Sequence, residues 1–311
     1  MKTKLWLALL SLYIVWGSTY LAIRFAVETM PAFLHGSIRF LISGAILYVW
    51  RRAAGDAMPT KKQWRSTAII GTFLLLGGNG LVSLAEKTVP SGIAALIIAT
   101  APFWLVLFES FRSGGGKPTW LSILGLIIGF GGVFLLIGPA RITGAQQSFD
   151  PFGITLLLIA PLLWSLGSIY AKGADLPKST LLSTGMQMLM GSISLFIVSV
   201  ATGELNGFSL GEISMRSWWG LIYLIVFGSL IGFVSYGWLL QNSPVSLMST
   251  YAYVNPVVAV FLGWLLADEI LNARIALATA IIIGSVLLIN YARQSKVKTE
   301  PLQAVPGGDK Q

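Results

Sequence analysis

Residues 217–267 read SWWGLIYLIVFGSLIGFVSYGWLLQNSPVSLMSTYAYVNPVVAVFLGWLLA, a run of 51 residues without a charged side chain. A transmembrane helix needs about 20 predominantly apolar residues, so this run is too long for one span. The polar, proline-containing segment Gln241-Asn242-Ser243-Pro244 divides it in two. The stretch therefore predicts two consecutive transmembrane helices.

Working outward from this stretch, charge-free runs of 18 to 25 residues locate seven more spans. A further apolar helix, 33–50, carries Arg39 inside it. The seven runs lie between Lys4 and Arg24, Arg65 and Glu86, Lys87 and Glu109, Lys117 and Arg141, Asp150 and Lys172, Lys178 and Glu204, and Arg274 and Arg293. The sequence thus predicts an all-α integral membrane protein with ten transmembrane helices.

The composition agrees with this class. Of 311 residues, 55% are hydrophobic and 11% are charged, whereas soluble domains carry about 25% charged residues. The chain has no cysteine and one histidine, His35, so disulfides, thiolate chemistry and His-rich metal clusters are excluded and no metal or cofactor is expected. The net charge of +9 is better explained by basic cytoplasmic loops than by nucleic-acid binding.

The distribution of Lys and Arg between alternate loops predicts the orientation. With the N-terminus inside, the cytoplasmic side holds 15 of these residues and the outer side five, Arg39 lying within a helix. The positive-inside rule then places both termini in the cytoplasm of a multi-pass inner-membrane protein. The first apolar run could be a secretory signal, but it continues through Trp16 to Tyr20 without a small-residue cleavage site, which favours a membrane helix. The polar tail, 293–311, is predicted to be disordered.

The chain contains an internal repeat of about five helices. Pro90 and Pro102 recur as Pro244 and Pro256, each 154 positions later, and Trp16 recurs as Trp164 after 148 positions. The two units are 5–140 and 150–292. Because five is odd, the second unit enters the membrane from the opposite side, and such inverted repeats are typical of secondary transporters with a substrate site between the halves.

The sequence resembles the EamA-type exporters of the drug/metabolite transporter superfamily over about residues 5 to 292. The resemblance is carried by Trp16-Gly17-Ser18-Thr19-Tyr20, Arg39-Phe40, Gly78-Asn79-Gly80, Ala85-Glu86, Pro90-Ser91-Gly92-Ile93-Ala94-Ala95, the stretch from Ala252 to Val260, and Asp268-Glu269. It implies ten helices, two EamA repeats, cytoplasmic termini, export of small metabolites, and a site lined by helices 1, 3, 4, 6, 8 and 9. The chain departs from the family at Gly114-Gly115-Gly116-Lys117, where the first repeat often has a Gly-Glu pair.

Polar and aromatic side chains within the spans are the candidates for a substrate site. Arg39 is the one strong charge well inside a span; such residues usually face a cavity or a partner, although a structural bond or snorkelling to the outer interface is the alternative. Pro102 and Pro256 interrupt helical hydrogen bonding at repeat-related positions and predict helix breaks for gating, or else static kinks. The predicted substrate-binding residues are Trp16, Tyr20, Arg39, Asn79, Ser83, Trp104, Trp164, Tyr236, Tyr251 and Asn255.

The sequence says little about energy coupling. Glu86 and Glu109 fall at span ends. Glu109 is either solvated or, if it is buried, able to titrate near neutral pH, so facilitated efflux and proton antiport both stay open.

A channel-like facilitator is the alternative function, and a membrane-embedded enzyme is disfavoured because a nucleophile–base pair is missing. The expected partners are a small-molecule substrate and the lipid bilayer, with no nucleic acid. Gly125-x-x-x-Gly129 and Gly228-x-x-x-Gly232 permit close helix contacts, within the monomer or at a homodimer face.

Overall fold

The computed structural model describes residues 2–111, 119–137, 149–242 and 251–299, and this part of the chain is helical, without strands. The first half holds α1 (Lys2–Ala26), α2 (Ala32–Ala53), α3 (Lys61–Gly71), η1 (Thr72–Gly80), α4 (Leu81–Ala85), α5 (Ser91–Ile98), α6 (Ala101–Phe111) and α7 (Trp120–Ile137). The second half holds α9 (Pro151–Ala171), α10 (Thr180–Ala201), η2 (Leu210–Glu212), α11 (Met215–Tyr223), η3 (Leu224–Ile231), α12 (Gly232–Asn242), α14 (Tyr251–Leu266) and α15 (Ala273–Thr299).

Eight helices in the described ranges are long and apolar enough to cross a membrane. Three of them combine several elements. The elements α3, η1 and α4 run on without a break, as do α11, η3 and the first part of α12, and α5 and α6 together form one span across the turn at Ala99–Thr100. The segments Val254–Leu266 and Ala273–Ile289 add two shorter apolar helices. The all-helical fold is therefore confirmed for the described ranges, and it is consistent with a membrane protein, while the count of ten spans stays a prediction.

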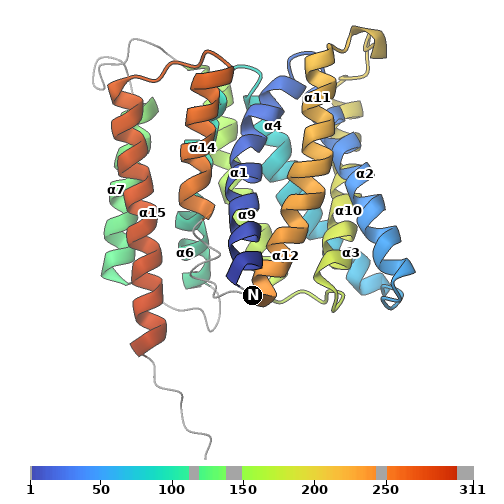
Figure 1. Ribbon diagram of the computed structural model, residues 1–311, viewed down its shortest axis with the longest axis horizontal. Coiled ribbons are helices and arrows are strands. Elements are labelled where there is room, and N and C mark those ends of the chain that lie inside the picture. The colour runs from blue at the N-terminus through green and yellow to red at the C-terminus, as the bar shows by residue number, and fades with distance from the viewer. Residues whose placement is uncertain (1, 112–118, 138–148, 243–250, 300–311) are drawn as a thin grey trace, which may run out of the picture.

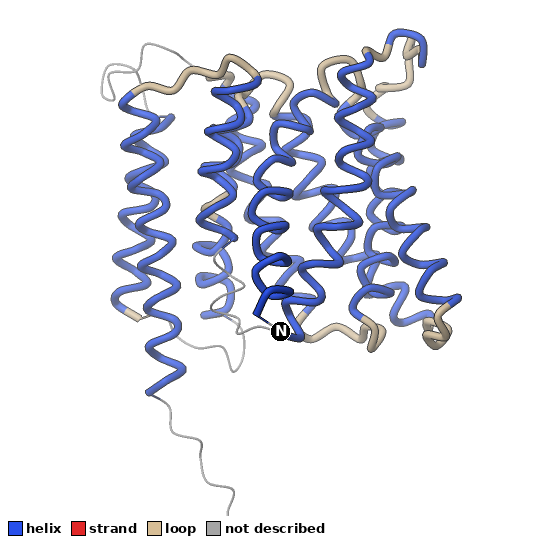
Figure 2. The backbone as a smooth tube through the Cα atoms, in the orientation of Figure 1, coloured by secondary structure: helices blue, strands red, loops and turns tan. Residues whose placement is uncertain are grey.

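The helices stand side by side and run alternately up and down (Figure 1). The N-terminus and the end of α15 lie at one end of the bundle, and loops connect the helices at both ends (Figure 2). We call the opposite end, which holds the turns 27–31, 86–90, 202–214 and 267–272, the far end. The paired α7 and α15 form one edge of the bundle and α2, α3 and α10 form the other, with α1, α9 and α14 between them (Figure 1).

Several helix starts follow from local sequence. Thr60 and Gln63 form a capping box in which each side chain bonds the other's backbone N–H, which satisfies donors that have no partner within the helix. Asp150 accepts from the N–H groups of Phe152 and Gly153, ahead of a first-turn proline. The helices thus begin where polar capping residues meet the apolar runs.

Glycines let the helices α2 and α10 approach each other closely. The backbones of α2 and α10 meet at Gly44 and Gly185, where a Cβ on Gly44 would stand 2.9 Å from the Gly185 carbonyl oxygen. Any larger side chain would push the helices apart. The predicted close contacts at Gly125 and Gly129 lie within the chain, against Ile289 and Phe103, so packing inside the monomer accounts for this motif.

Two regular spans contain π-helical segments at related places. η1 includes Asn79 and η3 includes Gly228 and Ser229. A π-helical turn adds a residue to the helix circumference and is often found at functional sites, because it turns side chains and carbonyls out of the regular pattern. Both segments border the central cavity described below.

The structure differs from the sequence prediction at the C-terminal tail, and several other predicted features lie outside the described residues. The helix α15 runs to Thr299, beyond Arg293 where the disordered tail was predicted to begin, because Arg, Gln and Lys readily extend an existing helix. Residues 300–311 lie outside the described part, as do the divergent Gly114-Gly115-Gly116-Lys117 and the repeat mates Ser243 and Pro244.

Candidate functional site

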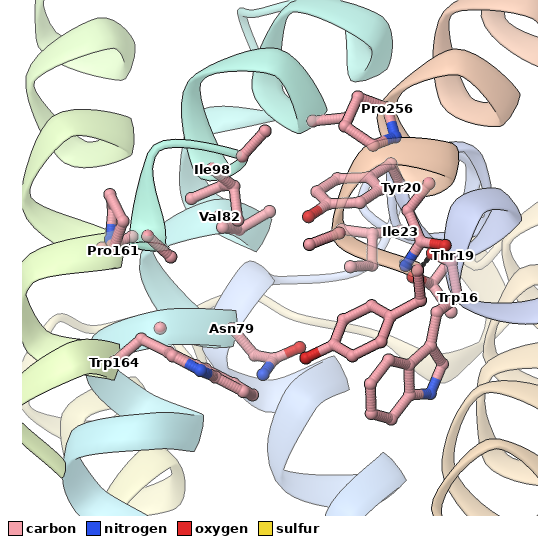
Figure 3. Close-up of a pocket in the computed structure, with 18 of the residues that line it drawn as sticks. Trp16, Thr19, Tyr20, Ile23, Asn79, Val82, Ile98, Pro161, Trp164 and Pro256 are labelled. Carbon is pink, nitrogen blue, oxygen red and sulfur yellow. Dashed lines mark hydrogen bonds between the residues drawn. The ribbon is translucent and has the colours of Figure 1, made fainter. Parts of the chain in front are cut away.

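A cavity of about 210 Å³ lies at the centre of the bundle, between the two halves of the chain. Figure 3 shows Asn79 and Trp164 on one side of it and Trp16, Thr19 and Tyr20 on the other. Its lining comes from α1, α2, η1, α4, α5 and α6 of the first half and from α9, η3, α12 and α14 of the second. The cavity therefore lies where an inverted-repeat transporter would hold its substrate.

The wall formed by Trp16 is fixed by its surroundings. The indole Nε1 donates to the Gly228 carbonyl at 3.2 Å. The ring stacks on Tyr236 and meets Tyr251 edge-on, with centroid separations of 5.4 and 5.3 Å. A buried indole needs a hydrogen-bond acceptor, and the π-helical η3 supplies it. This side of the cavity is a rigid aromatic surface.

Arg39 provides the charge of the cavity. Its side chain reaches the lining from α2 while only 4% exposed. Nε donates to the Ser229 hydroxyl at 3.0 Å, and the guanidinium lies 4.7 Å from the centroid of the Phe40 ring. Among the described residues no carboxylate pairs with it. A buried cation without a counter-ion is strongly unfavourable, so the Arg39 guanidinium could offset the charge of an anionic group placed in the cavity.

The opposite wall depends on the π-helical η1. Trp164 of α9 packs its ring over the backbone of Gly78, where a Cβ would stand 2.7 Å from the indole. The next residue, Asn79, lines the cavity, and its amide nitrogen has one long bond, 3.4 Å, to the Leu74 carbonyl. The Asn79 side chain thus keeps hydrogen-bonding capacity at the cavity wall.

The two repeat-related prolines both line the cavity in different helical settings. Pro102 follows a break at Ala99–Thr100 and lies in the first turn of α6, whereas Pro256 lies inside α14. Asn255 precedes Pro256. Its amide nitrogen donates to the backbone carbonyls of Tyr13, at 3.2 Å, and Tyr251, at 3.1 Å. Asn255 therefore links α1 to α14 besides bordering the cavity.

Most of the predicted substrate residues come together, and three lie outside the lining. The cavity brings together Trp16, Tyr20, Arg39, Asn79, Trp164, Tyr251 and Asn255. Tyr236 stands behind Trp16 in the aromatic stack. Trp104 packs against Phe108 and Phe130. Ser83 is 2% exposed within the packed bundle.

The two halves are joined at the far end by a carboxylate. Glu269, after α14, accepts from the N–H of Ser91 at 2.6 Å, the Ser91 hydroxyl at 2.7 Å and the N–H of Gly92 at 2.9 Å. These groups form the start of α5, where the helix dipole favours a negative charge. The backbone of Gly92 also lies directly against Val260. This cap ties α5 to α14, whereas α6 packs on α9 and α15.

Several residues at or next to the cavity escaped sequence reasoning. Gly228 and Ser229 supply partners to Trp16 and Arg39, but a π-helical turn leaves no pattern in a uniformly apolar run. Pro161, inside α9, lines the cavity as well, and a third mid-span proline in the sequence could have revealed it. No cluster of His, Cys, Asp or Glu in the described ranges could hold a metal ion.

A multi-pass helical bundle with an aromatic cavity between its halves has the construction of a membrane transporter. The model of the EamA-like transporter family matches residues 3–138 and 151–291, and the chain belongs to this family.

Similar proteins agree with this assignment. The chain is 36% identical to the "Uncharacterized inner membrane transporter YedA" of Escherichia coli K12 over 288 residues, which is 92% of this chain and 90% of the relative. It is 22% identical to the "Uncharacterized transporter YoaV" of Bacillus subtilis, covering 93% and 97% of the two chains. A crystal structure at 21% identity superposes with a TM-score of 0.61 over 93% of this chain and 98% of that one, which indicates the same fold. The protein is a multi-pass inner-membrane transporter.

Proposed function

We propose that the protein exports small amphipathic organic metabolites that carry a carboxylate, such as amino acids, across the inner membrane by alternating access. The observation that carries this proposal is the buried guanidinium of Arg39, without a carboxylate partner in the described chain, in a cavity walled by tryptophan and tyrosine. Such a cavity suits a solute with one anionic and one apolar part.

Ten spans in two inverted five-helix repeats form the framework of the proposal. Asp56, after α2, accepts a hydrogen bond from the Ser179 hydroxyl at the start of α10. Its counterpart Glu204, 148 positions later and after α10, accepts from the N–H groups of Phe33 and Leu34 at the start of α2. The same separation relates Trp16 to Trp164. At each end of this helix pair, a carboxylate that follows one helix thus meets the start of the other, which supports an inverted repeat.

The contacts of the fourth predicted span support an inward-facing state. Its upper part, α5, is held to α14 by Glu269 at the far end, while its lower part, α6, turns away after the break at Ala99–Thr100. With both termini in the cytoplasm, the far end is the periplasmic side. Opening this end and closing the other would pass the solute outward.

A channel-like facilitator is the second candidate. The packed far end argues against a continuously open path, because Gly92 at the start of α5 lies directly against Val260 of α14 and bonds to Glu269. A carrier saturates with its substrate, whereas a channel conducts without a conformational cycle, so flux measurements separate the two.

A comparison of metabolites outside cells tests the export. Cells producing the unaltered protein should accumulate a small set of carboxylate-containing solutes outside, and cells producing Asn79→Leu, Trp164→Ala at equal membrane abundance should not, because both side chains form one wall of the cavity. Trp120→Ala is a matched control, since Trp120 is 70% exposed at the start of α7. Identical profiles for all three proteins under varied growth conditions would contradict the proposal.

A further inference from the structure

Glu86 lies in the turn between α4 and α5 at the far end, and its carboxyl group is buried. The residue is 0% exposed, and neither Oε1 nor Oε2 has a hydrogen-bond partner within the described chain. Its backbone carbonyl, in contrast, accepts from the Arg24 guanidinium. An ionised carboxylate in such a place is strongly unfavourable, so the surroundings select the protonated form.

The charged and titratable groups that face Glu86 come from two elements. Tyr20 and Arg24 of α1 and Glu269 after α14 interact with it electrostatically. Burial raises the pKa of Glu86 well above its usual range, and the charge of Glu269 adds to this, against the opposing effect of Arg24. The nearest cation therefore does not outweigh desolvation.

The other elements packed around this turn direct their polar groups elsewhere. Asp150, at the start of α9, bonds to the Thr88 hydroxyl at 2.7 Å. His35 of α2 bonds to the Ala32 carbonyl and interacts electrostatically with Arg39. Glu86 is thus left with Tyr20, Arg24 and Glu269 as its polar neighbours.

The position of Glu86 relates it to both the closure and the cavity. Glu269, which faces it, is the residue that caps α5 and joins the halves at the far end. Tyr20, which also faces it, lines the central cavity. Opening the far end would bring water to the Glu86 carboxyl, which would return it toward an ordinary acidity.

We propose that Glu86 is a proton-binding site whose occupancy closes the far end and thereby makes the opening of that end, and with it transport, depend on pH. This inference rests on the proposed function. The proton binds one carboxyl oxygen while the far end is closed. When that end opens, the O–H bond breaks, the proton passes to water, and the carboxylate is stabilised by water and Arg24. Reclosure requires a proton to be taken up again.

A distance measurement without substrate tests this. The chain has no native cysteine, so Lys87→Cys and Leu266→Cys, exposed positions on the two sides of the far end, take one spin label each. Double electron–electron resonance in lipid nanodiscs then reports the populations of closed and open far ends as a function of pH. Each unit by which the pKa of Glu86 differs between the two states changes their ratio tenfold, so we expect the ratio of open to closed far ends to rise at least about tenfold between mildly acidic and alkaline pH.

Three variants test whether Glu86 causes the pH-dependent change in the ratio of open to closed far ends. Glu86→Gln mimics the protonated carboxyl and should stay closed at every pH, whereas Glu86→Asp keeps an ionisable group and should retain a pH response. Glu28→Gln is the matched control, since Glu28 is a partly exposed carboxylate at the same end, paired with Arg216, and it should respond like the unaltered chain. A pH-independent distance in the unaltered chain, or an unchanged response in Glu86→Gln, overturns the inference. Because no substrate is used, either outcome is independent of whether export is found.

Discussion

Replacing Arg39 by glutamine should reduce export of the solutes that accumulate outside wild-type cells by about 30-fold or more. Removing one partner of a buried charged hydrogen-bonded pair typically costs at least about 2 kcal/mol, which corresponds to this factor in affinity. Arg39 has the Ser229 hydroxyl as its hydrogen-bond partner, and no carboxylate in the described chain offsets its charge. The loss should therefore appear in transport.

Thermal unfolding without substrate separates this role from a structural one. Glutamine removes a buried charge that lacks a counter-ion, so Arg39→Gln should unfold at the same temperature as the unaltered protein or higher. Arg39→Lys keeps the charge without the planar donor pair and should retain part of the export. Undiminished export by Arg39→Gln, or a loss of export accompanied by an equal loss of stability, would count against anion binding at this residue.

Replacing Glu269 by glutamine should open the far end at neutral pH, with a change of at least about tenfold in the ratio of open to closed states. The carboxylate accepts three hydrogen bonds from Ser91 and Gly92 at the start of α5. Hydrogen bonds to charged groups contribute about 1.5–3 kcal/mol, and an amide can place only one acceptor atom there while its NH2 group would face another donor. The spin-label pair at positions 87 and 266 measures the change.

The neighbouring acid supplies the control for this second prediction. Asp268→Asn removes one negative charge at the same turn but leaves the bonds between Glu269 and α5 in place. Asp268 has a positive φ of 53°, which asparagine tolerates well. Equal opening in both variants would show that the net charge of the turn, and not the cap on α5, holds the far end closed.

The sequence predicted the elements of the fold better than their details. Apolar runs identified the spans because the bilayer requires about 20 apolar residues in each. The break associated with Pro102 follows from local chemistry, since proline lacks an N–H and its first-turn position suits the start of α6. The π-helical segments η1 and η3 were not predicted, because their sequences are as apolar as those of their α-helical neighbours.

The sequence predicted those site residues that lie inside the spans, but not those whose roles depend on contacts between distant segments. Arg39, Trp16 and Trp164 were found from burial arguments, since polar atoms inside a membrane span must face a cavity or a partner. The roles of Glu86 and Glu269 depend on contacts across the bundle, which a sequence at span ends does not specify. Glu109, for which the sequence left solvation or burial open, is part of an ion pair with Lys172.

Counterflow in liposomes tests alternating access through the central cavity most directly. The purified protein is reconstituted, the vesicles are loaded with the unlabelled solute that cells export, and entry of the same solute in labelled form is followed. Alternating access predicts that internal solute accelerates entry, that entry saturates, and that Asn79→Leu, Trp164→Ala abolishes both effects. Entry that is linear in concentration and indifferent to internal solute would contradict a carrier and favour a channel.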